Sequence, residues 1–529
     1  MSTGTNSMVN TSLIWSKKIA VTLSLISLSA CNSHIKNLPE ISDIEVPKKW
    51  ETPVQKETPP SLPPKVISEK ETQPEPIEEP VVEVKKVENG WLSSFNDEEL
   101  DKYVNVALEN NPDLISSAAQ LKSAIKQVNI TGSNLWPTLR ANLNQNRTTV
   151  EGSALSEVND LNDTAGVTTE VRTVQATLDV SWEADVWGKL TQRKKAAAYS
   201  AQAQGELFKD VELSLVANVS RAWYNLVTSK LQLDLAHQRL DSFKGTASLI
   251  EENYKNGISS ALDVYLSRSD VQQQIASLSD TRFEYIQTLR AFKTLLEEYP
   301  DSNLEFNAKL PELDEPIPTG LPAQLLTRRP DIKARQLTYK SEIANAKAAQ
   351  RDLYPTINFT GSIGDSRDTF NQLFDGDNLI RRFISDLTAP IFASGSLRSL
   401  RDQAVYTAES SYADLITTTL NAFEEVENSL SQETSLREQK QAIQEAVGLA
   451  ENGLEIALDR YKLGIENYNT VLESQRRVFD SKENEINIRN SLLQNRITVH
   501  LALGGDFSDE EGRDPLQNLP TLQKESVKK

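Results

Sequence analysis

The strongest pattern of hydrophobic and polar residues lies between Val174 and Val186. Apolar side chains occupy every even position of this stretch, and polar side chains occupy every odd position. Strict alternation over these thirteen residues predicts a β-strand with one apolar and one polar face. A tilted strand needs roughly 9–11 residues to cross a bilayer, so the stretch is long enough. The polar face carries the carboxylates of Asp179, Glu183 and Asp185.

A face of this polarity fits a water-filled lumen, and the opposite face fits lipid. We therefore interpret Asp179, Glu183 and Asp185 as residues that line a barrel lumen. Periodicity alone also allows the half-buried sheet of a soluble domain. Weaker alternation marks three further strands, and the predicted strand pairs are 138–150 with 171–187, and 356–366 with 380–392.

Four strands per chain cannot close a barrel. Eight strands from a dimer would close around a lumen that side chains just fill, whereas twelve strands from a trimer leave an open channel. Cyclic symmetry is the expected way to combine identical chains.

Long segments rich in Ala, Leu, Glu, Gln and Lys separate the strands, and these residues favour helix. The segment from Gly188 to Gly257 alone would form a helix on the order of 100 Å long. Such lengths are typical of a coiled coil or a helical array. The predicted helices are 188–256 and 258–298, then 330–353, 396–463 and 466–503.

The chain contains two copies of one unit. Pro112 and Pro137 are 25 residues apart, as are Pro330 and Pro355, and "NYKNGISSALDV" matches "RYKLGIENYNTV" 207 residues later. The segment "WGKLTQRKKAAAYSA" likewise matches "SGSLRSLRDQAVYTA". Three matching blocks in the same order indicate a tandem repeat. The first repeat spans 89–298, a linker spans 299–328, the second repeat spans 329–505, and a polar tail spans 506–529.

The single cysteine follows a basic start and a short apolar run, in "LISLSACNS". This arrangement predicts a secretory signal peptide over residues 1–30. Because Cys31 stands at the cleavage point, as in a bacterial lipobox, we expect it to be acylated. The alternative is a signal peptide with an incidental cysteine. Asn32 favours sorting to the outer membrane, and the Pro- and Glu-rich stretch over 31–88 predicts a disordered tether.

The remaining composition narrows the function class. A net charge of -19 argues against a nucleic-acid partner. The three histidines lie far apart in the sequence, and the common motifs of hydrolases, metalloproteases and phosphate-binding loops do not occur. We therefore expect no enzyme activity, no metal and no cofactor apart from the covalent lipid at Cys31.

Seven motifs resemble the outer-membrane factor family, the TolC-like efflux channels, in its lipoprotein branch that serves drug pumps. The resemblance covers about residues 90–505. It implies an α+β membrane protein in which a long α-helical coiled-coil barrel joins a transmembrane β-barrel completed by trimerisation. The motifs are "GWLSSFNDEELDKYVNVALENNPDL", "EADVWG", "LLTRRPDIKARQ", "YPTINFTGSIG", "APIFASG", "RYKLGI" and "LALGG".

The resemblance also implies partners and a location. The protein would be a homotrimer in the cell outer membrane, anchored by lipid and extending into the periplasm. It would work with a periplasmic adaptor protein and an inner-membrane pump. The segments near 97–110, 299–328 and 505–515 would form an equatorial belt.

Two groups of site residues follow from the resemblance. The helix turns would form the periplasmic tips that meet the adaptor, and acidic residues beyond them would ring a closed aperture. A glycine that caps a helix and an exposed helix charge are the simpler interpretations. The tip residues are Tyr254, Gly257, Tyr461 and Gly464, and the aperture residues are Asp263, Thr470 and Glu473.

The function implied is a passive trimeric duct that exports small molecules, such as drugs and toxic compounds. The alternatives are a structural coiled-coil lipoprotein of the outer membrane and the exit duct of a type I protein secretion system. The sequence does not indicate the exported substrate or which pump and adaptor are used.

Overall fold

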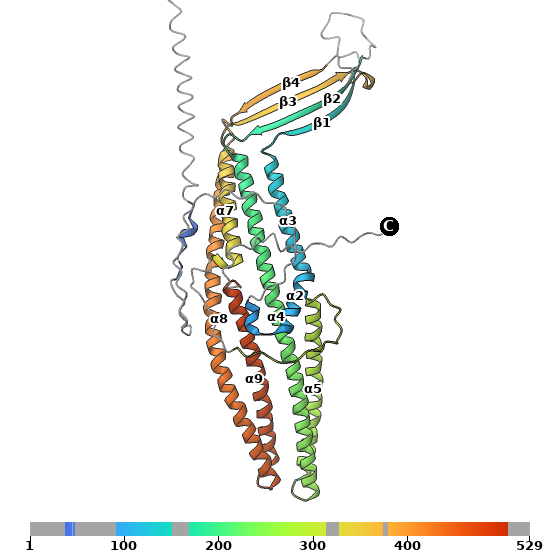
Figure 1. Ribbon diagram of the computed structural model, residues 1–529, viewed down its shortest axis with the longest axis vertical. Coiled ribbons are helices and arrows are strands. Elements are labelled where there is room, and N and C mark those ends of the chain that lie inside the picture. Colours follow the sequence, from blue (N-terminus) through green and yellow to red (C-terminus); the bar gives the residue numbers. More distant parts are fainter. Residues whose placement is uncertain are drawn as a thin grey trace, which may run out of the picture. The chain divides into compact units, whose positions relative to one another are not determined.

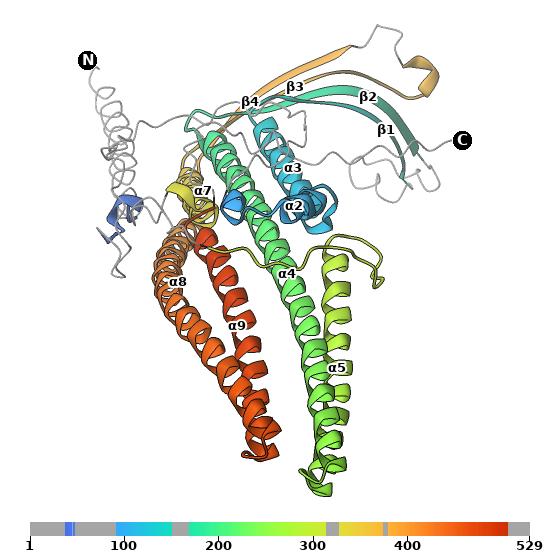
Figure 2. The same cartoon turned by 60° about the horizontal axis from the view of Figure 1, so that its bottom comes forward.

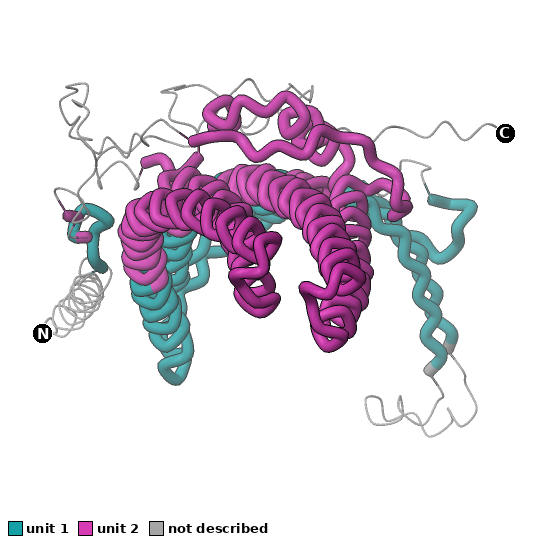
Figure 3. Tube along the Cα trace, turned by 90° about the horizontal axis from the view of Figure 1, so that it is seen from below, with its two compact units in different colours: residues 1–43, 123–202, 337–413 teal, residues 44–122, 203–336, 414–529 magenta. Residues whose placement is uncertain are grey.

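A computed structural model of the chain describes residues 38–44, 46–47, 91–150, 169–313, 327–373 and 379–505. The predicted signal peptide, Cys31, most of the predicted tether and the tail at 506–529 lie outside these residues. The chain divides into two compact units, which Figure 3 colours separately. Unit 1 contains 123–202 and 337–413 together with the segment that ends at Asp43, and unit 2 contains 44–122, 203–336 and 414–529.

The two halves of the chain contain the same order of long elements (Figure 1). The helices α4 and α8 have 67 residues each, and α5 and α9 have 35 residues each. No helix among the described residues is long and apolar enough to cross a membrane. The elements are α2 (Glu98–Asn110), α3 (Pro112–Ser133), β1 (Thr138–Val150), β2 (Thr169–Ala184), α4 (Lys189–Lys255), α5 (Ala261–Leu295), α7 (Pro330–Arg351), β3 (Thr356–Arg367), β4 (Ile380–Thr388), α8 (Ser396–Lys462) and α9 (Tyr468–Ala502), with short 3-10 helices at Ile41–Asp43, Trp91–Phe95 and Phe370–Gln372.

Unit 1 is built around one antiparallel sheet in the order β1-β2-β3-β4. Leu139 lies opposite Val180, and Leu178 lies opposite Ile363, so these apolar residues share one face. Asn142, Thr177 and Gly364 stand in the same row on the other face. The alternation of the sequence therefore appears in the structure as two faces of opposite polarity.

Two strands end earlier than their patterns predict. β2 ends at Ala184, because a turn follows in which the amide of Gly188 donates to the carbonyl of Asp185 at 3.1 Å. β4 ends at Thr388 and not at residue 392. Pro390 lacks the amide hydrogen that a further pair of ladder bonds would need.

A close approach of two backbones fixes the pairing of β2 with β3. A Cβ atom on Gly364 would overlap the carbonyl oxygen of Ala176 and would lie 2.9 Å from the Cα of Thr177. A side chain at this position would therefore push the two strands apart. Glycine is needed here for space, and not for an unusual backbone angle.

The segment that precedes the folded body also contacts unit 1. The hydroxyl of Tyr339, on α7, donates to the carbonyl of Pro39 at 2.5 Å. The ring of Tyr339 packs against that of Tyr412, on α8, with centroids 5.3 Å apart. Burial and the nearby Tyr412 and Asp43 raise the pKa of Tyr339 to about 12. This hydrogen bond joins the chain to α7 at Pro39, which lies eight residues after Cys31 and within the predicted tether.

Unit 2 has an aromatic core where α2 packs against α4 and α5. Trp223 lies 5.0 Å from Tyr103 and 5.7 Å from Phe292, measured between ring centroids. Asp97 caps α2 by accepting from the amides of Glu99 and Leu100, and it also accepts from the Trp223 indole at 2.9 Å. One carboxylate therefore starts the helix and holds it on the core.

Buried charges in unit 2 are paired. Arg329 is largely buried and donates to Asp331, to Glu425 at 2.6 Å and to the carbonyl of Ala502. Arg496 donates to Glu433 at 3.0 Å. Because a buried charge without a partner is costly, these pairs hold α7, α8 and α9 in one arrangement.

We expect Gly364→Ala to destabilise the sheet by about 1–3 kcal/mol, because the added methyl group overpacks the contact between β2 and β3. The measurement is the temperature at which the folded band of the purified protein disappears on a gel. Gly361→Ala is the matched control, since its Cβ would lie 4.0 Å from the nearest atom, Val180 Cβ. Equal thermal stability of the two variants would contradict the close approach.

Candidate functional site

Two helical hairpins of unit 2 end in glycine turns (Figure 2). Gly257 and Gly464 have φ angles of +76° and +72°, in the left-handed region that favours glycine. The amide of Ile258 donates to the carbonyl of Asn253 at 2.8 Å, and that of Ile465 donates to Arg460 at 3.0 Å. These bonds form Schellman caps, so the prediction that both glycines cap helices is confirmed.

The two tyrosines of the tip motif lie in different environments. Tyr254 is 49% exposed, whereas Tyr461 is only 5% exposed. The Tyr461 hydroxyl lies 2.7 Å from that of Ser259, and its ring packs in a cluster with Ile250, Tyr468 and neighbouring residues. The side chain of Tyr461 therefore packs in the core beneath the tips, and of these two tyrosines only Tyr254 is exposed; the contact of the tips with an adaptor stays a prediction.

Four other apolar side chains are exposed at the turns. They follow or flank the two glycines, and their exposed fractions lie between 55% and 72%. The sequence analysis missed them, although an isoleucine directly after each capping glycine is a repeated signal. These residues, here named the tip patch, are Ile258, Leu262, Leu463 and Ile465.

A buried carboxylate links α5 and α9 below the tips. Asp270 is 8% exposed, and it accepts from the Tyr468 hydroxyl at 2.8 Å and from Arg476 at 3.3 Å. Burial, together with the hydrogen bond and charge of Asp270, raises the pKa of Tyr468 well above its ordinary value. The sequence analysis did not identify Asp270, because its spacing does not distinguish it from exposed helix acids.

The predicted aperture residues lie in or just beyond the first turns of α5 and α9. Asp263 forms a capping box with Ser260, and each accepts from the other's amide at 3.1–3.2 Å. Glu473 is exposed and lies 3.5 Å from Arg476. Negative charge is favourable in the first turn of a helix, so Asp263 also stabilises α5.

Thr470 is a half-buried part of the α9 cap. Its amide donates to Asn467 at 3.0 Å, and its hydroxyl donates to Glu466 at 3.0 Å. The hydrogen bond from Thr470 lowers the pKa of Glu466. Asp263, Thr470 and Glu473 each have their own partners, which are Ser260, Glu466 with Asn467, and Arg476.

The polar face of the sheet contains two of the three predicted lumen residues. Asp179 accepts from Asn142 at 2.5 Å and from Thr177 at 2.9 Å, and Glu183 pairs with Lys189 at 2.5 Å. Asp185 lies beyond the end of β2. Its carboxylate accepts from the amides of Leu190 and Thr191 at 2.8 Å, so it caps α4 and does not occupy a strand position.

Among the described residues, no group of three or more His, Cys, Asp or Glu side chains is arranged to hold a metal ion. The acidic residues of the site act instead as caps, ion-pair partners and a polar lining.

The chain is similar to several efflux proteins. It is 27% identical over 436 residues to the toluene efflux pump outer membrane protein TtgC of Pseudomonas putida, covering 82% of this chain and 88% of that protein. It is 26% identical over 421 residues to the cation efflux system protein CusC of Escherichia coli, covering 79% and 88%. The crystal structure of the Campylobacter jejuni CmeC outer membrane channel matches 88% of this chain and 96% of its own, with a TM-score of 0.74 at 21% identity, and supports the fold.

The model of the outer membrane efflux protein family matches residues 103–297 and 321–505. These ranges contain the sheet, the long helices and both glycine turns described above. The chain therefore belongs to the outer membrane efflux protein family.

Proposed function

We propose that the protein is the outer-membrane channel component of a tripartite efflux system, a passive duct for small molecules. The observation that carries this proposal is the sheet of unit 1. Its apolar face is exposed along four strands, and its polar face carries Asp179 and Glu183. A sheet with these two faces suits a barrel wall between lipid and water.

The edges of the sheet support a trimer. β1 pairs only with β2, and β4 pairs only with β3, within the described residues. Backbone groups left unpaired in a bilayer cost several kcal/mol each, so both edges need a partner strand. Three chains would supply twelve strands, which leave an open lumen. The equal lengths of the long helices in the two halves support an origin by tandem duplication.

Acylation of Cys31 is the second part of the proposal. The contact between Tyr339 and Pro39 supports it, because eight residues span at most about 28 Å. A lipid on Cys31 would thus be held within that reach of α7.

The proposed partners are a periplasmic adaptor and an inner-membrane pump. The tip patch supports this, because exposed apolar side chains around a rigid turn suit a protein contact. Relatives named for toluene efflux and for cation efflux both support a small solute as the exported substrate. The alternative of a structural lipoprotein would require no conductance.

The aperture forms the last part of the proposal. Threefold symmetry would bring three copies each of Asp263 and Glu473 around one axis. Carboxylates held together between low-dielectric walls attract cations and bind multivalent cations through oxygen. The bond from Tyr468 to Asp270 would hold α9 against α5 in the closed state.

We expect the purified trimer to conduct cations in a planar bilayer, with a small conductance that trivalent cations block from the tip side. Asp263→Asn combined with Glu473→Gln should raise the conductance. It should also raise the concentration of trivalent cation needed for half-block by about tenfold or more. The amide at position 263 can still accept from Ser260, so the helix cap is kept. The measurement is single-channel recording.

Glu252→Gln combined with Asp459→Asn is the matched control, because it removes the same charge from the last turns of α4 and α8. This control should keep the wild-type block. If the Asp263 and Glu473 variant behaves like the control, these carboxylates are ordinary surface charge. If the wild-type trimer does not conduct at all, the proposal that the protein is a duct is wrong.

We expect Leu178→Arg to reduce the folded trimer far more than Ser181→Arg. An arginine on the lipid face near the membrane midplane costs about 2–4 kcal/mol, whereas the lumen hydrates it. Both residues lie on β2, three positions apart, on opposite faces. The amount of heat-resistant trimer in membranes reports the difference, and equal amounts would argue against a membrane strand.

We expect Cys31→Ser to abolish incorporation of labelled palmitate, because serine offers no thiol to the acyl transferase. The barrel should still hold the variant in the membrane. Retained labelling of the serine variant would exclude the lipobox interpretation.

A further inference from the structure

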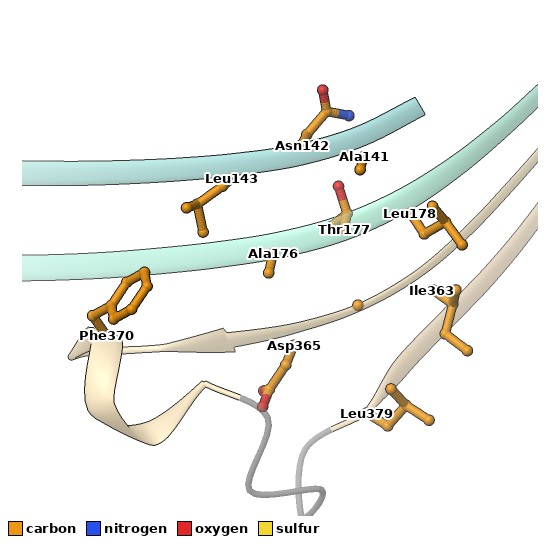
Figure 4. Close-up of a pocket in the computed structure, with 11 residues that line it drawn as sticks. Ala141, Asn142, Leu143, Ala176, Thr177, Leu178, Ile363, Asp365, Phe370 and Leu379 are labelled. Atoms are coloured by element: carbon orange, nitrogen blue, oxygen red, sulfur yellow. The ribbon is translucent and has the colours of Figure 1, made fainter. Parts of the chain in front are cut away.

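The two outer strands of the sheet, β1 and β4, expose more apolar surface than the inner strands. Leu178, Val180 and Ile363 of the inner strands are 38–40% exposed. Figure 4 shows Leu143 and Leu178 on one side of the sheet, with Asn142 pointing to the other. A neighbouring strand would cover the apolar side chains of the outer strands, which are 61–74% exposed: Leu139, Leu143, Phe383 and Leu387.

The polar face of the outer strands carries two charged side chains of opposite sign. Arg140 of β1 lies opposite Asp179, and Asp386 of β4 shares a row with Glu183, so both belong to the polar face. Arg140 and Asp386 are exposed. In the part of the chain that the structure describes, neither side chain has a recorded ion pair or hydrogen bond. Each outer strand thus offers one charge to a neighbour.

A ring of three chains would join β4 of each chain to β1 of the next. Within one chain, Arg140, Asp179, Ser362 and Arg382 lie in one row across the four strands. The residue of the next β1 that faces Arg382 is residue 140 plus a displacement, here named the junction offset. This offset must be even, because an odd value would turn the apolar side chains of one strand to the polar face.

The tilt of the strands limits the junction offset. Each strand rises about 3.3 Å per residue, the strands lie about 4.8 Å apart, and three equal offsets add up around twelve strands. Offsets of two, four, six and eight residues then give tilts of about 19°, 35°, 46° and 54°. Strands of membrane barrels are tilted by about 35–45°, which leaves offsets of four and six.

The length of the ladder sets the direction of the displacement. β4 has nine residues, and β1 has thirteen. At an offset of four, Thr388 at the end of β4 faces Thr138 at the start of β1, and every residue of β4 has a partner. The same displacement in the opposite direction would leave only Ile380 opposite β1. The junction is therefore displaced toward the far end of β1.

Side-chain pairs distinguish an offset of four from an offset of six. At four, Arg140 faces Asp386 on the polar face, whereas at six Arg147 faces Arg381 on the apolar face. Opposite charges directly across two strands stabilise a sheet, and like charges destabilise it. The apolar pairs at an offset of four are Leu139 with Leu387 and Leu143 with Phe383.

We infer that β4 of one chain pairs with β1 of the next at an offset of four, and that an ion pair between Asp386 and Arg140 of the next chain selects this register. An exposed ion pair adds little stability by itself. Its role is to select between two registers that form ladders of equal length. The inference rests on the proposed function, because it requires the trimeric barrel, and it adds the register and the residues that fix it.

Disulfide crosslinking measures the register. Ala141→Cys combined with Ser385→Cys places two cysteines directly opposite each other at an offset of four, with Cβ atoms about 5 Å apart. The matched controls combine Ser385→Cys with Leu139→Cys, for an offset of two, or with Leu143→Cys, for an offset of six. Cysteines displaced by two residues have Cβ atoms about 7 Å apart, so they should crosslink about tenfold more slowly or less. Non-reducing denaturing gels of the purified trimer report the crosslink, and Ser385→Cys alone reports any background from Cys31.

A charge swap tests the ion pair. Asp386→Arg places like charges opposite each other at three junctions, so it should lower the ratio of heat-resistant trimer to monomer about tenfold. Adding Arg140→Asp should restore the wild-type ratio. The matched control adds Arg382→Asp instead, which gives the same composition and net charge but leaves Arg140 facing an arginine. This control should not restore the trimer.

Faster crosslinking through Leu139→Cys or Leu143→Cys than through Ala141→Cys would overturn the register. Equal recovery of the trimer by Arg140→Asp and by Arg382→Asp would overturn the ion pair. Either result leaves the proposed function intact, because a trimer would still be present. Wild-type protein that forms no trimer at all would refute both this inference and the proposed trimeric duct.

Discussion

The pairing of β2 with β3 is the interaction on which the rest of the structure depends. β2 belongs to the first half of the chain and β3 to the second, and their ladder runs from Val174 opposite Arg367 to Ala184 opposite Ile357. A slip of one residue would turn every apolar side chain of one strand to the polar face. The close approach at Gly364 stands in this ladder, so the register and the separation of the two faces share one physical cause.

The long helices depend on other interactions. A helix of 67 residues is not stabilised by its own propensity, and most helical stability comes from packing. In unit 2 this packing is aromatic around Trp223 and ionic around Arg329 and Arg496. Toward the glycine turns the helices pack through the apolar cluster that contains Tyr461 and Tyr468. Below this cluster, the carboxylate of Asp270 accepts a hydrogen bond from the Tyr468 hydroxyl.

Much of this architecture follows from patterns along the chain. Alternation over Val174–Val186 locates β2, and the Tyr-Lys-x-Gly motif locates both turns, because backbone rules act locally. The sequence could not separate buried Tyr461 from exposed Tyr254, since the difference arises from the neighbours each meets in three dimensions. It also placed Asp185 in a strand, because the residue matches the alternation even though its carboxylate caps a helix.

The unequal burial of the two tip tyrosines has a consequence for how a partner would engage a threefold assembly. Each chain contributes two hairpins, so a ring of three chains would display six turns of nearly the same backbone shape. Only the turns after α4 carry an exposed tyrosine, whereas those after α8 keep theirs inside. Such a ring would therefore present two chemically different kinds of turn, three of each, and not six equivalent turns. A partner with six identical subunits would have to bind in two alternating ways, and one with three subunits could select a single kind of turn.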